Sequence, residues 1–249
     1  MLDEKKIKKW LITMEIFADT ANLNELQEFN SWGVIDGCTT NPIICVKSGI
    51  TDFEGHMKKI LAMIDGPVSI EVTTNDLDEM LMQAHMFATW GDNVVVKLPM
   101  NIPGLKATKV LSEEGIKTNV TACMSTKQAI LAAKAGATYV SIFWARIEDM
   151  GYDASIVVKD TREILDKHRM QSKIIIGSFR SMSHIITAMK TGAHVLTIPS
   201  DLLKNMHWNP RTESTINEFL DQWNGFHKDN DPMAKKILVS QDGELVRKH

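Results

Sequence analysis

The stretch AAKAGATYVSI (residues 132–142) contains the end of one expected helix, a glycine and the start of one expected strand. A second stretch, AMKTGAHVLTI (residues 188–198), repeats this pattern with Gly192 in the position of Gly136. A glycine at this position is typical of a helix that ends in a left-handed residue before the chain turns back. The repeat therefore predicts that one helix-to-strand unit recurs along the chain.

Eight short segments rich in β-branched residues are expected to be strands. They are residues 14–19, 34–40, 67–74, 93–99, 117–122, 138–144, 173–179 and 194–200. Their apolar runs indicate strands that are buried on both faces and are therefore parallel. Eight strands that alternate with helical segments over about 250 residues predict an α/β fold with a single (β/α)8 TIM barrel. A doubly wound open sheet is the competing fold, but the G-x-G-x-x-G sequence that often accompanies it does not occur.

The pattern predicts a single domain over residues 1–249, with the barrel at about 14–200. Residues 1–13 precede the first strand and are an N-terminal extension that could form an extra helix. Residues 201–226 are expected to form one or two terminal helices. The polar C-terminal tail, residues 227–249, is either an arm that docks on a neighbouring subunit or a frayed end.

The composition narrows the classes of partner. The chain has 249 residues, with 28 Lys and Arg against 31 Asp and Glu, so the net charge of −3 argues against nucleic acid or an anionic membrane as partner. No apolar run approaches a membrane span, and no signal-peptide core follows the first residues. Cys38, Cys45 and Cys123 form no metal-type pair, and the histidines lack metal-ligand spacing. We therefore expect a cytoplasmic protein without a metal site.

Polar side chains gather at the C-terminal ends of the predicted strands, where TIM barrels carry their functional sites. They are Asp19, Thr39, Thr40, Asn41, Glu71, Lys97, Asn119, Thr121, Ser141, Arg146, Ser178 and Arg180. Lys97 is the most informative, because it lies in the apolar strand VVVKLP and lysine is almost never fully buried unless paired. Desolvation and nearby arginines would lower its pKa, and a neutral amine can form a Schiff base with a ketone. The alternative is a structural ion pair with Glu71 or Asp19.

Two carboxylates and two arginines extend this candidate site. Asp19 and Glu71 could perform acid–base catalysis, or they could only neutralise the lysine. Arg146, Ser178 and Arg180 follow the sixth and seventh strands and could clamp a phosphate or a similar anion. The alternative for the arginines is that they are solvated side chains on loops.

Motifs along most of the chain resemble the small transaldolase family, which also contains fructose 6-phosphate aldolases. The motifs are MEIFADTANLNEL, DGCTTNP, SIEVT, VVVKLP, NVTA, SIFWARI and GSFRS, between about residues 14 and 226. The resemblance implies a (β/α)8 barrel that uses a Schiff-base lysine and no cofactor. It also implies a homo-oligomer, for which a decamer is one assembly.

The resemblance also implies a role for each matching residue. Lys97 is the expected Schiff-base lysine, and Asp19 is the expected acid–base group for the C4 hydroxyl. Glu71 and Thr121 are expected to hold a catalytic water. The expected substrate-binding residues are Thr40, Asn41, Asn119, Ser141, Phe143, Arg146, Ser178 and Arg180, of which Arg146, Ser178 and Arg180 would form the phosphate site.

Two positions bear on the branch of the family. The aldolases resemble a pattern with Gln at position 71 and Tyr at position 143, whereas this chain has Glu71 and Phe143. Phe143 has no hydroxyl that could transfer a proton and help to release a free three-carbon product, so transfer is preferred over cleavage. The sixth strand also departs from the usual Ser-Pro-Phe-Val-Gly-Arg, because Trp144 and Ala145 precede the arginine.

We therefore expect a transaldolase, a transferase of carbohydrate metabolism that moves a dihydroxyacetone unit from a ketose 6-phosphate to an aldose. Its pathway would be the pentose phosphate pathway. The departure near Arg146 leaves open a 6-deoxy-6-sulfofructose donor, and hence sulfoglycolysis, because a sulfonate carries about one negative charge and a phosphate ester about 1.5 to 2. A fructose 6-phosphate aldolase is a further alternative. A non-catalytic barrel that binds a sugar phosphate is the alternative from another class.

Overall fold

The computed structural model describes residues 14–226, 237–239 and 245–247. The predicted helix within residues 1–13 lies outside the described residues, as does most of the predicted tail. Within the tail, β9 (Ile237–Val239) and β10 (Leu245–Arg247) form an antiparallel pair.

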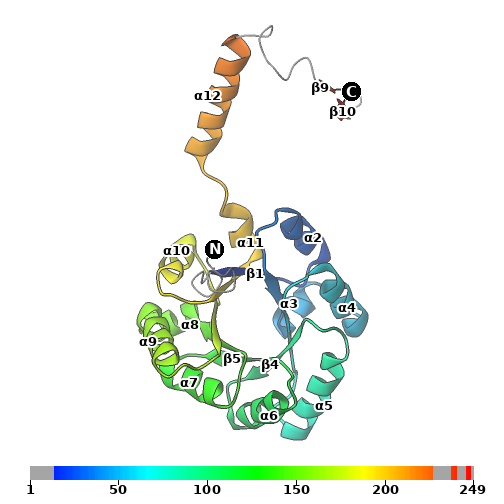
Figure 1. The fold of residues 1–249 in the computed structure, drawn as a ribbon, viewed down its shortest axis with the longest axis vertical. Helices are drawn as coiled ribbons and strands as arrows, with labels where there is room; N and C mark the ends of the chain where they lie inside the picture. The colour runs from blue at the N-terminus through cyan, green and yellow to red at the C-terminus, as the bar shows by residue number, and fades with distance from the viewer. Residues whose placement is uncertain (1–13, 227–236, 240–244, 248–249) are drawn as a thin grey trace, which may run out of the picture. The chain divides into compact units, whose positions relative to one another are not determined.

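Eight parallel strands close into a barrel in the order β1 to β8, which confirms the predicted TIM barrel and excludes the open sheet. The strands are β1 (Glu15–Asp19), β2 (Gly37–Thr39), β3 (Val68–Glu71), β4 (Val94–Pro99), β5 (Thr118–Cys123), β6 (Tyr139–Phe143), β7 (Lys173–Gly177) and β8 (Val195–Pro199). The boundaries of each strand lie within two residues of the prediction, with two exceptions. The predicted segment for β2 began too early, and that for β3 ended too late. Figure 1 looks into the barrel, and the helices surround its strands.

Helices connect successive strands and surround the barrel. They are α2 (Leu23–Ser31), α3 (Pro42–Lys47), α4 (Phe53–Met63), α5 (Leu77–Ala88), α6 (Ile102–Glu113), α7 (Thr126–Lys134), α8 (Trp144–Asp149), α9 (Ala154–Lys167) and α10 (Met182–Met189). Two further helices follow β8, α11 (Ser200–Asn205) and α12 (Pro210–Phe226), and α12 belongs to a second compact unit that begins at Lys204. Many begin at a polar residue whose side chain accepts from a backbone N–H of the first turn, as Asn41 Oδ1 does from Ile44 at 2.9 Å. The terminal helices predicted over 201–226 correspond to α11 and α12.

The two glycines of the repeated sequence have the backbone conformation that the pattern predicts. Gly136 has φ of 97° and Gly192 has φ of 80°, and each follows a helix and precedes a strand. Side chains other than glycine rarely adopt this left-handed conformation. A Cβ at Gly136 would also lie 2.1 Å from Ser112 Oγ, so this turn requires glycine for space as well.

One layer of buried apolar side chains fills the barrel below the C-terminal ends of the strands. It consists of Phe17, Val95, Tyr139, Ile175 and Val195, each at most 5% exposed. Residues two apart on a strand point to the same side. The next inward-facing position along each of these strands therefore lies directly above this apolar layer, toward the mouth.

Candidate active site

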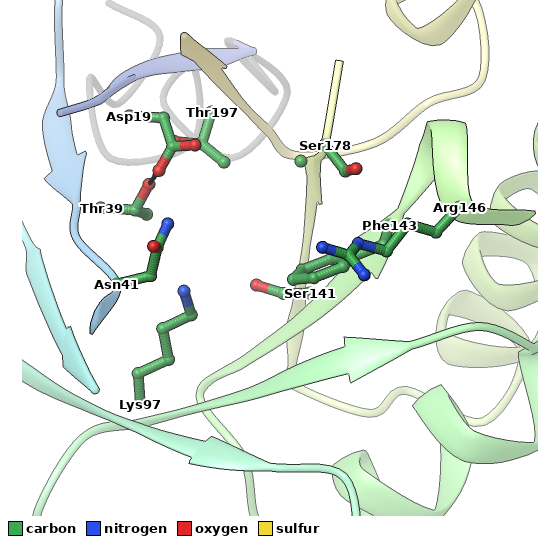
Figure 2. A pocket seen from close by; sticks show the side chains of 10 residues that line it. Asp19, Thr39, Asn41, Lys97, Ser141, Phe143, Arg146, Ser178 and Thr197 are labelled. Atoms are coloured by element: carbon green, nitrogen blue, oxygen red, sulfur yellow. Dashed lines mark hydrogen bonds between the residues drawn. The ribbon is translucent and has the colours of Figure 1, made fainter. Parts of the chain in front are cut away.

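The inward positions above the apolar layer are occupied by Asp19, Lys97, Ser141, Gly177 and Thr197. Each lies two residues beyond a member of the apolar layer, so strand periodicity alone places the five at one level. They line a cavity of about 170 Å³ together with Thr39, Asn41, Phe143, Arg146 and Ser178. Figure 2 shows the labelled side chains gathered around this cavity.

Lys97 is buried at the centre of this site, with 5% of its surface exposed. Its Nζ lies 2.9 Å from Glu71 Oε2, and it donates to the Thr40 backbone carbonyl at 3.1 Å. Glu71 is the register partner of Lys97 on the adjacent strand β3, so strand pairing brings the two charges together. The ion pair that the sequence left open is therefore present. It does not exclude covalent chemistry, because the same carboxylate can take a proton from the amine.

Thr40 supports this lysine through its backbone rather than its side chain. Its hydroxyl donates to the Ser69 carbonyl at 2.8 Å, which turns the side chain toward β3. Asn41 follows it and does line the cavity. Because Asn41 Oδ1 caps α3, its amide nitrogen remains as a donor toward the cavity.

Asp19 is the second ionisable group deep in the cavity. Burial raises the pKa of its carboxyl above the ordinary value, and the Glu71 charge adds slightly to this effect. The Lys97 charge and a hydrogen bond from Thr39 oppose the rise in pKa. Thr39 Oγ1 donates to Asp19 Oδ1 at 2.7 Å. A carboxyl with a raised pKa is a stronger base when ionised, which suits it to accept a proton from a substrate hydroxyl.

Asn119 and Ser141 form a buried hydrogen-bonded pair. Ser141 Oγ donates to Asn119 Oδ1 at 2.7 Å, and Asn119 Nδ2 donates to Ser69 Oγ at 3.1 Å. Ser141 lines the cavity, whereas Asn119 lies behind it and is completely buried. The pair therefore orients the Ser141 oxygen, whose lone pairs are left for a substrate hydroxyl.

Thr121 lies on β5, outside the residues that line the cavity. Its Oγ1 is buried and has no hydrogen-bond partner within the described part of the chain. An unpaired buried hydroxyl costs about 1–3 kcal/mol, so such a group is usually kept for a reason.

Arg146 and Ser178 form the outer wall of the cavity, beside Phe143. The guanidinium carbon of Arg146 lies 5.7 Å from the centre of the Phe143 ring. Ser178 has φ of 63°, an uncommon conformation for a residue other than glycine, and its carbonyl accepts from the Ala145 backbone at 3.2 Å. This bond holds the start of α8 against the end of β7, so Arg146 and Ser178 face the same cavity.

Arg180 does not line the cavity with them. Its guanidinium forms two hydrogen bonds with the Asp149 carboxylate, at 2.7 and 2.6 Å, and its side chain is 56% exposed. These bonds also hold the pKa of Asp149 below its usual range. Arg180 was expected beside Arg146 because both follow adjacent strands, but α8 presents an acidic side chain that pairs with it instead.

Trp144 does not enter the cavity either. It is 2% exposed, donates from its indole nitrogen to Glu148 Oε1 at 2.7 Å, and packs against Phe179 with 6.5 Å between ring centres. The unusual tryptophan, predicted in the sixth strand, is therefore the first residue of α8 and lies outside the cavity wall.

Three cavity residues were missing from the predicted site: Thr39, Gly177 and Thr197. Thr39 was noted as a polar strand end, but the resemblance gave it no role. Thr197 could have been found, because it is a hydroxyl residue at an inward position near the end of the eighth strand. Gly177 carries no side-chain signal.

The other chemical possibilities are limited. No three His, Cys, Asp or Glu side chains gather as a metal site within the ranges that the structure describes. Burial raises the pKa of the Cys38 thiol, and raises that of Cys123 to about 12, so both disfavour the reactive thiolate. In the described part of the chain, no helix has the length and apolar character needed to cross a membrane.

Comparison with known proteins shows the family of this chain. A family model described as Transaldolase/Fructose-6-phosphate aldolase matches residues 16–242. Relatives from Streptococcus pyogenes serotype M5 (strain Manfredo), serotype M49 (strain NZ131) and serotype M1 are each named probable transaldolase. Each is 46% identical over 215 residues, which cover 86% of this chain and all of the relative. The expected transaldolase activity, a transferase activity, agrees with these names, and the chain belongs to the transaldolase/fructose-6-phosphate aldolase family.

Proposed function

We propose that this protein transfers a dihydroxyacetone unit from a ketose 6-phosphate to an aldose through a Schiff base on Lys97. The observation that carries the proposal is a buried lysine, 2.9 Å from Glu71, in a cavity that also holds the partly buried carboxyl of Asp19. A lysine in this setting can pass its proton to the carboxylate and attack a ketone as the free amine.

Formation of the Schiff base begins when Lys97 Nζ attacks the C2 carbonyl carbon of the donor. The new C–N bond forms as the carbonyl electron pair moves to oxygen, which takes up a proton. The hydroxyl of this carbinolamine then leaves as water after it receives a second proton. Glu71 is placed to accept the amine proton and return it, and the unpaired Thr121 hydroxyl is available to hold the water.

Cleavage requires a base at the C4 hydroxyl. Asp19 takes that proton, the C3–C4 bond breaks, and its electron pair moves into the iminium to give an enamine on Lys97. The C4 fragment leaves as an aldehyde. Burial raises the pKa of Asp19, so its ionised form has a greater tendency to accept this proton. An acceptor aldehyde then reacts in the reverse sense and receives the three-carbon unit.

Phe143 supports transfer over simple cleavage. Net cleavage needs a proton on C3 of the enamine, and the phenyl ring at this position of the cavity has no proton to give. The double substitution Glu71→Gln with Phe143→Tyr should therefore raise net cleavage relative to transfer, with the release of free dihydroxyacetone in the absence of acceptor as the readout. A ratio of release to transfer no higher than in wild type would speak against this assignment.

The terminal anion of the donor is proposed to bind Arg146 and Ser178. Of the ten described residues that line the cavity, Lys97 and Arg146 are the two with basic side chains. Lys97 serves the reacting carbon, so Arg146 is the single charge left for the anion, since Arg180 is paired with Asp149. This charge balance favours a second candidate donor, 6-deoxy-6-sulfofructose, whose sulfonate carries one negative charge. That donor would place the reaction in sulfoglycolysis rather than the pentose phosphate pathway.

Assembly and location are part of the same proposal. We propose a cytoplasmic homo-oligomer without a cofactor, with a decamer as the expected assembly. Helix α12 supports self-association, because Ile216, Phe219 and Leu220 are each more than half exposed. Sedimentation of the purified chain measures the subunit number, and a monomer would contradict the oligomer.

Trapping with borohydride tests the chemistry directly. Incubation with fructose 6-phosphate or 6-deoxy-6-sulfofructose, followed by reduction, should add mass to the peptide that carries Lys97. Lys97→Ala should abolish the adduct, whereas Lys109→Ala, which changes an exposed lysine of α6, should leave it unchanged. An adduct that survives Lys97→Ala would disprove the proposal, and no adduct with either sugar would favour a binding protein. The ratio of the reaction rates with fructose 6-phosphate and with 6-deoxy-6-sulfofructose then distinguishes the phosphate donor from the sulfonate donor.

A further inference from the structure

Thr197 on β8 lines the cavity but has no role in the steps of the proposed reaction. It is 6% exposed, and its Oγ1 lies 2.5 Å from Thr39 Oγ1. Thr39 in turn donates to Asp19 at 2.7 Å. Figure 2 shows the two threonines and the carboxyl as one hydrogen-bonded chain of three side chains.

The direction of these bonds follows from counting protons. An ionised carboxylate can only accept hydrogen bonds, and a hydroxyl has a single proton to donate. While Asp19 is ionised, Thr39 therefore gives its proton to the carboxylate. The short contact between the hydroxyls must then be a donation from Thr197 to Thr39.

The orientation of Thr197 is restricted by packing. A Cβ built on Gly177 would lie 3.0 Å from the Thr197 methyl group, so this methyl packs against the bare backbone of β7. Threonine is branched at Cβ, and its methyl and hydroxyl turn together about one bond. Packing of the methyl on Gly177 thus directs the hydroxyl toward Thr39.

We propose that Thr197 is a positioning residue that commits the Thr39 proton to Asp19 and so holds the carboxylate ready to accept the C4-hydroxyl proton. This inference rests on the proposed function. Two hydroxyls suit a carboxyl that changes its protonation state, because a hydroxyl can reverse from donor to acceptor and a backbone N–H cannot. When Asp19 carries the proton, it can donate to Thr39.

The inference predicts a change in pH dependence. The charged groups that face Asp19 are Lys97 from β4, which lowers its pKa, and Glu71 from β3, which raises it. The Cys38 thiol of β2 is also near, but burial raises its pKa and it stays neutral. The Thr39 bond lowers the pKa of Asp19, so a weaker bond should raise this pKa and move the acid limb of kcat/KM to higher pH.

The experiment compares Thr197→Val with Thr197→Ser. Valine keeps the methyl that packs on Gly177 and removes the hydroxyl, whereas serine keeps the hydroxyl. For the valine variant we expect kcat/KM at pH 7 to fall roughly three- to tenfold and the acid limb to rise by about half a pH unit. The serine variant should have a kcat/KM and an acid limb close to those of wild type. Borohydride trapping of Lys97 should stay within about twofold of wild type in both variants, because Schiff-base formation does not need the C4 base.

A double-mutant cycle tests whether Thr197 acts through Thr39. In a Thr39→Val background, Thr197→Val should have no further effect on the acid limb. Acid limbs that coincide for wild type and Thr197→Val would overturn the inference. A serine variant as impaired as the valine variant would overturn it too, and so would a loss of trapping in proportion to activity. Absence of trapping in wild type would instead overturn the proposed function, so the two failures are distinguishable.

Discussion

The cavity has two walls of different origin. The inner wall is carried by strands, and Asp19, Lys97 and Ser141 occupy inward positions two residues beyond buried apolar side chains. The outer wall is carried by the first residues after β6 and β7, where Arg146 faces the cavity and Arg180 turns to Asp149. Strand periodicity determines the direction of a side chain, whereas a residue after a strand end depends on what its neighbours offer.

The two walls also differ in how far their charged side chains are exposed to water. Lys97 and its carboxylate partner are largely removed from water, with 7% and 21% of their side chains exposed. The Arg180–Asp149 pair is exposed on both sides, at 56% and 52%. Charges are screened at such an exposed pair, whereas a buried charge depends on its partners. The inner wall should therefore be far more sensitive to substitution than the outer wall.

Among the substitutions that compare the two walls, Asp19→Asn should cause the largest loss of activity. Asparagine keeps the shape and still accepts the Thr39 bond, but it cannot take up the C4 proton. Loss of a general base costs typically about 10²- to 10⁴-fold in rate, so kcat for transfer should fall in this range. Steady-state assays with fructose 6-phosphate and an aldose acceptor measure this kcat. Asp149→Asn, which changes a carboxylate of the outer region, is the control, and an equal loss there would contradict the comparison.

Arg146→Ala should have the next largest effect. A charge-assisted contact to the donor anion is worth about 1.5–3 kcal/mol, so KM should rise roughly ten- to a hundredfold. A neutral ketose that lacks the terminal anion should react poorly with wild type and be little affected by the substitution. Initial rates with charged and neutral donors check this, and equal reactivity of the two donors in wild type would show that Arg146 is structural.

Arg180→Ala should have a smaller effect than Arg146→Ala, because the guanidinium is bound to Asp149 rather than directed into the cavity. An exposed pair contributes little to stability, and we expect KM to change by less than about threefold. If KM rises as much as in Arg146→Ala, Arg180 leaves Asp149 and binds the anion when the donor is present. The original expectation for this residue would then be correct.

The smallest expected effect is on stability, and its sign is opposite to that on activity. The folded-state pKa of Asp19 is raised, so between the ordinary and the raised pKa the folded state binds more protons, and stability is lost as pH rises through the folded value. Asp19→Asn removes this cost and should raise Tm slightly at pH 7. The gain in Tm should shrink as the pH falls toward 4. Thermal melts at several pH values test this, and a constant Tm difference would contradict the assigned burial cost.

The sequence showed the family resemblance, and the strand pattern predicted most residues of the inner wall. The apolar run VVVKLP predicted a buried lysine on a parallel strand, and Asp19 and Glu71 were polar residues of the first and third predicted strands. Ser141 was found for the same reason. The roles proposed for these residues still depend on the resemblance, because the residues themselves left a structural ion pair open.

Other features of the site could not be predicted because they depend on contacts between distant segments. Thr197 meets Thr39 across 158 positions of sequence, and only closure of the barrel brings β8 beside β1 and so near β2. Asn119 lies behind Ser141 and is hydrogen-bonded to both Ser69 and Ser141, while its expected contact with substrate stays a prediction. Neither contact leaves a local pattern in the chain.

The sequence alone determined the order of strands and helices, the left-handed turns at Gly136 and Gly192, and the level at which Asp19 and Lys97 project into the barrel. These features follow from local rules: the period of a strand, the conformational freedom of glycine, and the burial of apolar runs. The tertiary structure alone decided that Lys97 pairs with Glu71, and that Arg180 pairs with Asp149 and lies outside the cavity wall. The partner of a charge is set by the distance between groups in the folded chain, and the sequence by itself does not specify that distance.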